Sequence, residues 1–248
     1  MKTLALIRKE LASYFAGPLV YVVIGAFLAV TGYEFYTTLN SYVTFGFGMN
    51  ILENFWENFF VNHIGFYLLI VVPLFTMRLL AEERRLGTIE LLYTYPLRDR
   101  EIMLGKYIAC LLVFLLFLAG TLLYPIMVYV IQPYDPTPFV ARYLGAVLFL
   151  GACIAAGLFV SSLTDSQVVA SSCTFVLLLL FWKVTWNEAA VSSTFVTALS
   201  QLSTFDHFDP FSRGIIDLKD VVYFVLFIAL FLFLTLRSME SRQWRGRR

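Results

Sequence analysis

The stretch RLLAEERRLGTIELLYTYPLRDREIMLGK, residues 78–106, interrupts a strongly apolar chain with a dense run of charge. Its middle, GTIELL (87–92), is a short amphipathic segment that follows a cluster of acidic and basic residues. The sequence on either side is apolar, with almost no ionisable residues. The pattern predicts a charged loop between membrane spans, and its amphipathic centre indicates a coupling element that receives work from another protein.

The composition of the chain indicates an integral membrane protein. Of the 248 residues, 60% are hydrophobic and 14% charged, whereas about a quarter of the residues of a soluble domain are charged. A bilayer core of about 30 Å needs roughly 20 apolar residues per helix. Stretches of this kind occur at 19–39, 64–81, 103–131, 141–163, 167–186 and 219–237. We therefore expect an all-α polytopic membrane protein with six transmembrane helices, in which residues 1–248 form a single domain.

The basic residues predict the orientation of these spans. Three segments hold 14 of the 18 Lys and Arg residues: the N-terminus (Lys2, Arg8, Lys9), the charged loop (Arg78, Arg84, Arg85, Arg98, Arg100, Lys106) and the C-terminus (Arg237, Arg242, Arg245, Arg247, Arg248). By the positive-inside rule, both termini and residues 82–100 are cytoplasmic, with 40–63 and 187–218 outside. The basic tail RQWRGRR is typical of an anchor to anionic lipid, and nucleic acid is not an expected partner.

Three segments outside the spans have helical patterns. The pattern of residues 3–15 predicts an amphipathic helix that lies along the inner interface. The sequence alone favours the interpretation that this helix only anchors the chain and fixes its topology. The segment NILENFWENFFV (50–61) predicts an interfacial helix that floats in the outer leaflet or covers a partner subunit. Residues 187–218 predict short external or re-entrant helices covered by protein before the last span. Small residues of the spans, among them Gly151, Gly157, Ser161, Ser162, Ala170, Ser171 and Ser172, are interpreted as helix-packing positions.

The predicted spans lack the sequence patterns of a proton relay and of known catalytic sites. They contain no acidic and histidine chain for a proton relay, no HExxH or GxSxG motif, and Glu34, His63, Arg142 and Lys183 fall at predicted span ends, where they reach the interface. Cys110, Cys153 and Cys173 lie inside spans and suggest neither a disulfide framework nor a metal site. Asp206, His207 and Asp209 make a poor metal cage because Pro210 is expected to break the element that carries them. Because no GxxxxGK[ST] loop is present, a nucleotide that drives this protein must bind another chain.

Residues 78–106 resemble the first cytoplasmic loop of ABC-2-type transporter permeases, in which a charged cluster precedes a G-T-x-E-x-L-L helix, a downstream Pro and a G-K that enters the third span. The stretch FDHFDPFSRGIIDLKDVVYF (205–224) is similar to the gliding-motility-associated subgroup. The resemblance implies two permeases, identical or related, on cytoplasmic ATPase subunits that bind ATP and Mg²⁺, in a bacterial or archaeal plasma (inner) membrane. This chain would have no catalytic site and no cofactor of its own.

The same resemblance implies which residues contact the ATPase. Residues 87–92 would form the coupling helix, with Thr88 as its N-cap, and residues 1–18 would form the connecting helix that lies on the ATPase. The residues expected to couple are Glu82, Glu83, Arg84, Arg85, Gly87, Thr88, Ile89, Glu90, Leu91, Leu92 and Pro96.

Two functions fit this pattern. The first is a permease, most simply an exporter, in which ATPase motion acts on the 82–100 segment and opens a path for substrate. The second is a membrane scaffold that transmits the same motion through 40–63 and 187–218 to an extracytoplasmic accessory protein, in a motility or envelope role. Both use the same loop, and the spans do not identify a cargo.

Overall fold

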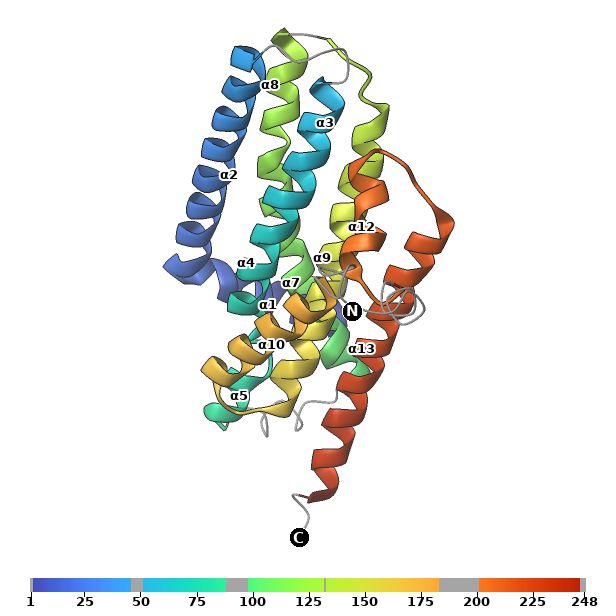
Figure 1. Cartoon of the computed structure of the whole chain (residues 1–248). Helices are drawn as coiled ribbons and strands as arrows, with labels where there is room; N and C mark the ends of the chain where they lie inside the picture. Colours follow the sequence, from blue (N-terminus) through green and yellow to red (C-terminus); the bar gives the residue numbers. More distant parts are fainter. Residues whose placement is uncertain (1, 46–50, 88–97, 132, 183–200, 246–248) are drawn as a thin grey trace.

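The computed structural model describes residues 2–45, 51–87, 98–131, 133–182 and 201–245 (Figure 1). These residues form helices and connecting turns, which confirms the expected all-α class. The helices are α1 (Lys2–Ala16), α2 (Pro18–Phe45), α3 (Ile51–Asn58), the π-helix η1 (Phe59–Gly65), α4 (Phe66–Thr76), α5 (Ala81–Arg85), α7 (Asp99–Thr121), α8 (Leu123–Ile131), α9 (Thr137–Leu163), α10 (Gln167–Trp182), α12 (Thr204–Ser212) and α13 (Leu218–Arg245).

Five helices in this part of the chain are long and apolar enough to cross a membrane. They are Pro18–Ser41, Phe55–Arg85, Asp99–Ile131, Thr137–Leu163 and Leu218–Ser241, and the apolar helix Gln167–Trp182 is shorter. The five correspond to five of the six predicted spans, and α10 corresponds to the sixth, of which residues 183–186 lie outside the described residues. The protein is therefore a multi-pass membrane protein.

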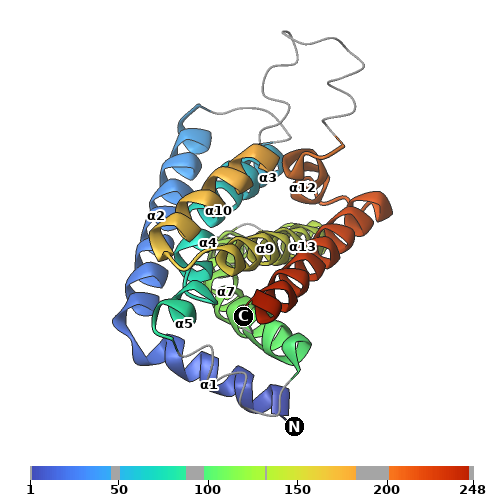
Figure 2. The ribbon, with the colours of Figure 1, turned by 90° about the horizontal axis from the view of Figure 1, so that it is seen from below.

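Helix α9 is the centre of the bundle, with α4, α7, α10, α12 and α13 packed around it (Figure 2). Its glycines allow this close approach: a Cβ on Gly157 would lie 2.6 Å from Thr76 Cβ, and one on Gly145 would lie 2.5 Å from Phe211 Cγ. Ser161 and Ala170 are buried as expected, but Ser171 and Ser172 on α10 are not. The prediction that small residues are packing positions therefore holds for α9 better than for α10.

Helix α1 lies across the end of the bundle rather than along it (Figure 2). It packs mainly on α7, where Leu6 is buried over Gly105, whose missing Cβ would otherwise lie 2.7 Å from Leu6 Cδ2. Leu4 on the same helix is 71% exposed. This placement agrees with an amphipathic helix that runs along a membrane interface.

The expectation that residues 50–61 float at the interface is wrong. Helix α3 continues through η1 into α4 as one long helix, and its aromatic side chains Phe55, Trp56, Phe59 and Phe60 are at most 1% exposed. Phe35 of α2 and Phe139 of α9 contact these rings. The four-residue repeat correctly indicated a helix with an aromatic face, but the face is buried in protein because neighbouring helices supply matching aromatic surfaces.

Three of the four charged residues expected at span ends, Glu34, His63 and Arg142, have partners on other helices, and the fourth, Lys183, lies outside the described residues. Glu34 Oε2 lies 3.3 Å from His63 Nε2, and Tyr67 donates to Glu34 Oε1 at 3.3 Å. Arg142 is 3% exposed and donates from Nε to the Ser212 carbonyl oxygen at 2.8 Å. These pairs could not be predicted from the sequence, because the two partners of each pair lie on different helices.

Helix α12 covers the N-terminal half of α9 with Phe208 and Phe211, which are buried. Pro210 lies within this helix and does not break it, contrary to expectation. His207 pairs with Asp220 of α13 at 2.6 Å, and the described residues contain no cluster of metal-ligating side chains. The predicted short, protein-covered helix before the last span is thus present, although residues 187–200 lie outside the described part of the chain.

Candidate coupling site

One hydroxyl of α9 accepts two hydrogen bonds from the segment that leads into the charged loop. Between α4 and α5 the chain turns at residues 77–80, and the backbone N–H groups of Leu80 and Ala81 both donate to Ser161 Oγ at 3.1 Å. Ser161 in turn donates to the Met77 carbonyl oxygen at 3.2 Å. These bonds satisfy N–H groups that the first turn of a helix leaves without an intrahelical partner. The start of α5 is therefore held at the end of α9.

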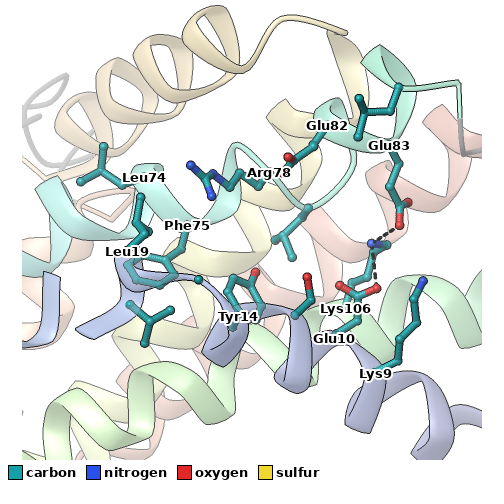
Figure 3. A pocket seen from close by; sticks show the side chains of 15 residues that line it. Lys9, Glu10, Tyr14, Leu19, Leu74, Phe75, Arg78, Glu82, Glu83 and Lys106 are labelled. Carbon is teal, nitrogen blue, oxygen red and sulfur yellow. Dashed lines mark hydrogen bonds and ion pairs between the residues drawn. The ribbon is translucent and has the colours of Figure 1, made fainter. Parts of the chain in front are cut away.

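A buried lysine connects α5 to two other helices (Figure 3). Lys106 Nζ on α7 lies 2.8 Å from Glu83 Oε1 on α5 and 3.3 Å from Glu10 Oε1 on α1. The three side chains are 2%, 16% and 13% exposed respectively. An ammonium between two carboxylates in such surroundings gives charge-assisted hydrogen bonds that constrain the positions of all three helices.

Arg84, the neighbour of Glu83, is directed to the opposite side. It donates to the Ser162 carbonyl oxygen at the end of α9 and lies 3.9 Å from Asp165 in the turn before α10. The Ser162 carbonyl also accepts from the Ser238 hydroxyl of α13 at 3.1 Å. Through these contacts α5 is connected to α9, α13 and the turn between α9 and α10.

The end of α5 is exposed. The helix ends before Gly87, whose φ of +69° is left-handed. Glycine adopts this conformation without the steric cost that a side chain would add. The Gly87 N–H donates to the Arg84 carbonyl at 3.1 Å, and Leu86 beside it is 61% exposed. Leu86 is thus an exposed apolar side chain at the end of α5, beside the cavity between α1 and α5.

The far side of the loop begins again at α7. Asp99 and Glu101 lie in its first turn, where negative charge is favoured by the helix dipole. Glu101 Oε2 also accepts the Arg98 backbone N–H at 2.9 Å, which fixes the helix start. The charged loop therefore leaves and re-enters the bundle at two defined points.

The structure describes five of the eleven predicted coupling residues. Glu82, Glu83, Arg84, Arg85 and Gly87 lie on α5 and at its end. The others, Thr88, Ile89, Glu90, Leu91, Leu92 and Pro96, lie outside the described residues, so the coupling helix itself stays a prediction.

Several residues at this site were not singled out from sequence. The sequence predicted Lys106 only as a basic residue of the charged loop and Ser161 and Ser162 only as packing residues, and it did not place Glu10 or Asp165 at the site. A lysine that follows three apolar residues and a glycine at the start of a span was the available signal for Lys106. Nothing in the sequence indicates which carboxylates it meets.

Comparison with known proteins agrees with this architecture. The family model described as ABC-2 family transporter protein matches residues 28–237, which is most of the chain and includes five of the predicted spans and the charged loop in full. This chain belongs to the ABC-2 family of transporter proteins. A comparison with curated proteins finds no match.

Family membership makes the protein a membrane permease component of an ABC transporter, which works with an ATPase partner. The match does not extend to the gliding-motility subgroup, so that similarity stays a prediction. In the permease, the site around α5 is where the charged loop that resembles a coupling loop is joined to the bundle.

Proposed function

We propose that this permease couples ATP hydrolysis on a separate cytoplasmic ATPase chain to the export of a substrate, and that the 82–100 segment receives the motion. The observation that carries the proposal is the attachment of α5. Hydrogen bonds and ion pairs connect it directly to α7 and α9, and through Lys106 to α1, while its end at Leu86 is exposed. An ATPase that pushes on the exposed end therefore acts on several helices at once.

The internal contacts give the acidic and basic residues of α5 different roles. Glu83 and Arg84 are engaged with Lys106 and Ser162, so they are suited to transmit a displacement into the bundle. Arg85 is exposed and is suited to contact the ATPase directly. A displacement of α5 would therefore be transmitted to the bundle, because a segment that is hydrogen-bonded to neighbouring helices cannot move without displacing them or breaking those bonds.

Two permease copies, or this permease and a related one, would form the complete transporter on two ATPase subunits, in the plasma (inner) membrane with both termini cytoplasmic. The exposed apolar faces of α2 and α13 support contact with lipid or a second copy; Tyr33 and Tyr36 are each 67% exposed and Leu226 is 62% exposed.

The test exchanges one exposed leucine for aspartate at the proposed ATPase contact and another near α12. Leu86→Asp places a charge at the proposed ATPase contact, whereas Leu202→Asp makes the same change at a leucine that is 52% exposed near α12. We expect Leu86→Asp to release the ATPase subunit or abolish ATP-dependent transport at matched membrane expression, because an unpaired charge in a packed contact typically costs several kcal/mol. Leu202→Asp should retain both.

Two results would contradict the proposal. One is wild-type ATPase retention and transport in Leu86→Asp, which would make this segment a topological spacer. The other is robust ATP hydrolysis by the purified permease alone, since the sequence has no phosphate-binding loop.

A further inference from the structure

A cavity of about 300 Å³ lies beside the Lys106 cluster, between α1, the start of α2, the end of α4, and α5. In Figure 3 its lining divides into two parts: Lys106, Glu10, Glu83 and Lys9 gather on one side, and Leu19, Leu74 and Phe75 on the other. Arg78 lies between them. The cavity is therefore amphipathic, and its position at the end of the spans beside α1 is where polar lipid headgroups meet acyl chains.

The charges of the lining balance. Lys9, Arg78 and Lys106 are basic, and Glu10, Glu82 and Glu83 are acidic. The Lys106 cluster is internally paired, but among the described residues no ion pair involves Lys9, Arg78 or Glu82. Lys9 is exposed to solvent, which leaves Arg78 and Glu82 as one cationic and one anionic group. A guest with one negative and one positive group would match both, whereas a purely anionic or purely cationic guest would match only one of them.

We propose that the cavity binds the headgroup of a zwitterionic phospholipid with a primary ammonium, of the phosphatidylethanolamine type. The Arg78 guanidinium binds the phosphodiester oxygens, for which its planar fork of donors is suited. Glu82 accepts N–H hydrogen bonds from the ammonium. A volume of 300 Å³ is at the lower end of ligand-pocket sizes and holds a headgroup rather than a whole lipid.

The apolar side of the cavity provides the exit for the acyl chains. Leu74 is 39% exposed at the surface of the spans, and Phe75 and Val20 form a buried floor. Tyr14 contributes a neutral hydroxyl, because burial raises its pKa well above the ordinary value. A soluble phosphate ester would use the charged side alone, so the leucine-lined side favours a lipid over a free headgroup.

The test measures lipid retention by the intact permease. The protein is reconstituted in vesicles that contain equal amounts of phosphatidylethanolamine, phosphatidylcholine and phosphatidylglycerol, extracted in mild detergent, and examined by native mass spectrometry. We expect one phosphatidylethanolamine per chain, retained about tenfold over the other two lipids, which is the ratio that one charge-assisted contact supplies. Excess soluble glycerophosphoethanolamine should not displace it.

Two variants test the assigned roles. Arg78→Gln should lower retention of all three lipids about tenfold, whereas Arg100→Gln, the same change at an exposed arginine outside the cavity, should leave retention unchanged. Glu82→Gln should remove the preference for phosphatidylethanolamine over phosphatidylcholine, because choline lacks N–H donors. Both variants alter side chains without an ion pair in the described part of the protein, so folding, checked by thermal unfolding, should be preserved.

Equal retention of the three lipids, a preference for phosphatidylglycerol, displacement by the soluble headgroup, or unchanged retention in Arg78→Gln would each overturn the proposal. If Arg78→Gln does not fold, the Glu82→Gln result alone decides between the outcomes. The readout involves no ATPase and no transport, so it is independent of the function proposed above.

Discussion

Removal of Lys106 should destabilise the protein. It is 2% exposed and lies between two carboxylates that are themselves mostly buried. Lys106→Met would leave Glu10 and Glu83 close together without a cation, and breaking a buried pair by removing one partner costs about 3–5 kcal/mol. We expect a loss at the lower end of this range, because both carboxylates retain some contact with water. Thermal unfolding of the detergent-solubilised permease measures the loss.

The control for Lys106 removes all three charges. Lys106→Met combined with Glu10→Gln and Glu83→Gln should recover most of the stability, because no uncompensated charge remains. If Lys106→Met alone unfolds like the wild type, the three side chains are not an interacting cluster.

Ser161 is the second residue with a defined and testable role. Ser161→Ala would leave the Leu80 and Ala81 N–H groups buried without their acceptor, at a cost of about 1–3 kcal/mol. Because the loss is local, amide hydrogen exchange should accelerate around residues 80–87 more than elsewhere. Ser171→Ala is the matched control, since Ser171 Oγ donates to Val168 of its own helix; equal exchange in the two variants would refute the role.

At the scale of elements, the contact between α9 and α4 depends on a missing side chain. A Cβ on Gly157 would lie 2.6 Å from Thr76 Cβ and 2.8 Å from Thr76 Cγ2, so Gly157→Ala must separate the two helices. Such overpacking costs about 1–3 kcal/mol. Gly25→Ala on α2 is the control, because nothing lies within 4 Å of the point that its Cβ would occupy.

Thermal unfolding distinguishes the two glycine variants. Gly25→Ala should be neutral or slightly stabilising, since alanine is the better helix former by about 1 kcal/mol. A Gly157→Ala protein as stable as Gly25→Ala would show that α9 and α4 are not in close contact.

At the scale of the whole molecule, the distribution of charge predicts which side each end of the bundle occupies. The three segments with 14 of the 18 basic residues should be cytoplasmic. In a variant without Cys110, Cys153 and Cys173, a cysteine at Leu86 should react with a membrane-impermeant thiol reagent only after permeabilisation. A cysteine at Leu202 should react in intact cells. Both leucines are more than half exposed, at 61% and 52%, so access to the reagent decides the result, and the opposite pattern would reverse the orientation.

The sequence by itself determined the class of the protein. Apolar runs of about 20 residues specify membrane helices because an unsatisfied backbone is not tolerated in lipid. The spacing of charge and glycine in residues 78–106 pointed to the ABC-2 permeases, which the match over residues 28–237 confirmed. These signals are local, so they can be read along the chain.

Only the tertiary structure decided which side chains meet. The aromatic face of α3 could have faced lipid or protein, and it is buried because Phe35 and Phe139, distant in sequence, lie opposite it. The sequence context of Lys106 marks a lysine at the start of a span, but only the fold brings Glu10 and Glu83 beside it. Pairing between helices depends on their relative rotation and height, which are set by packing at positions such as Gly105 and Gly157. That information is distributed over several helices, and no single stretch of sequence contains it.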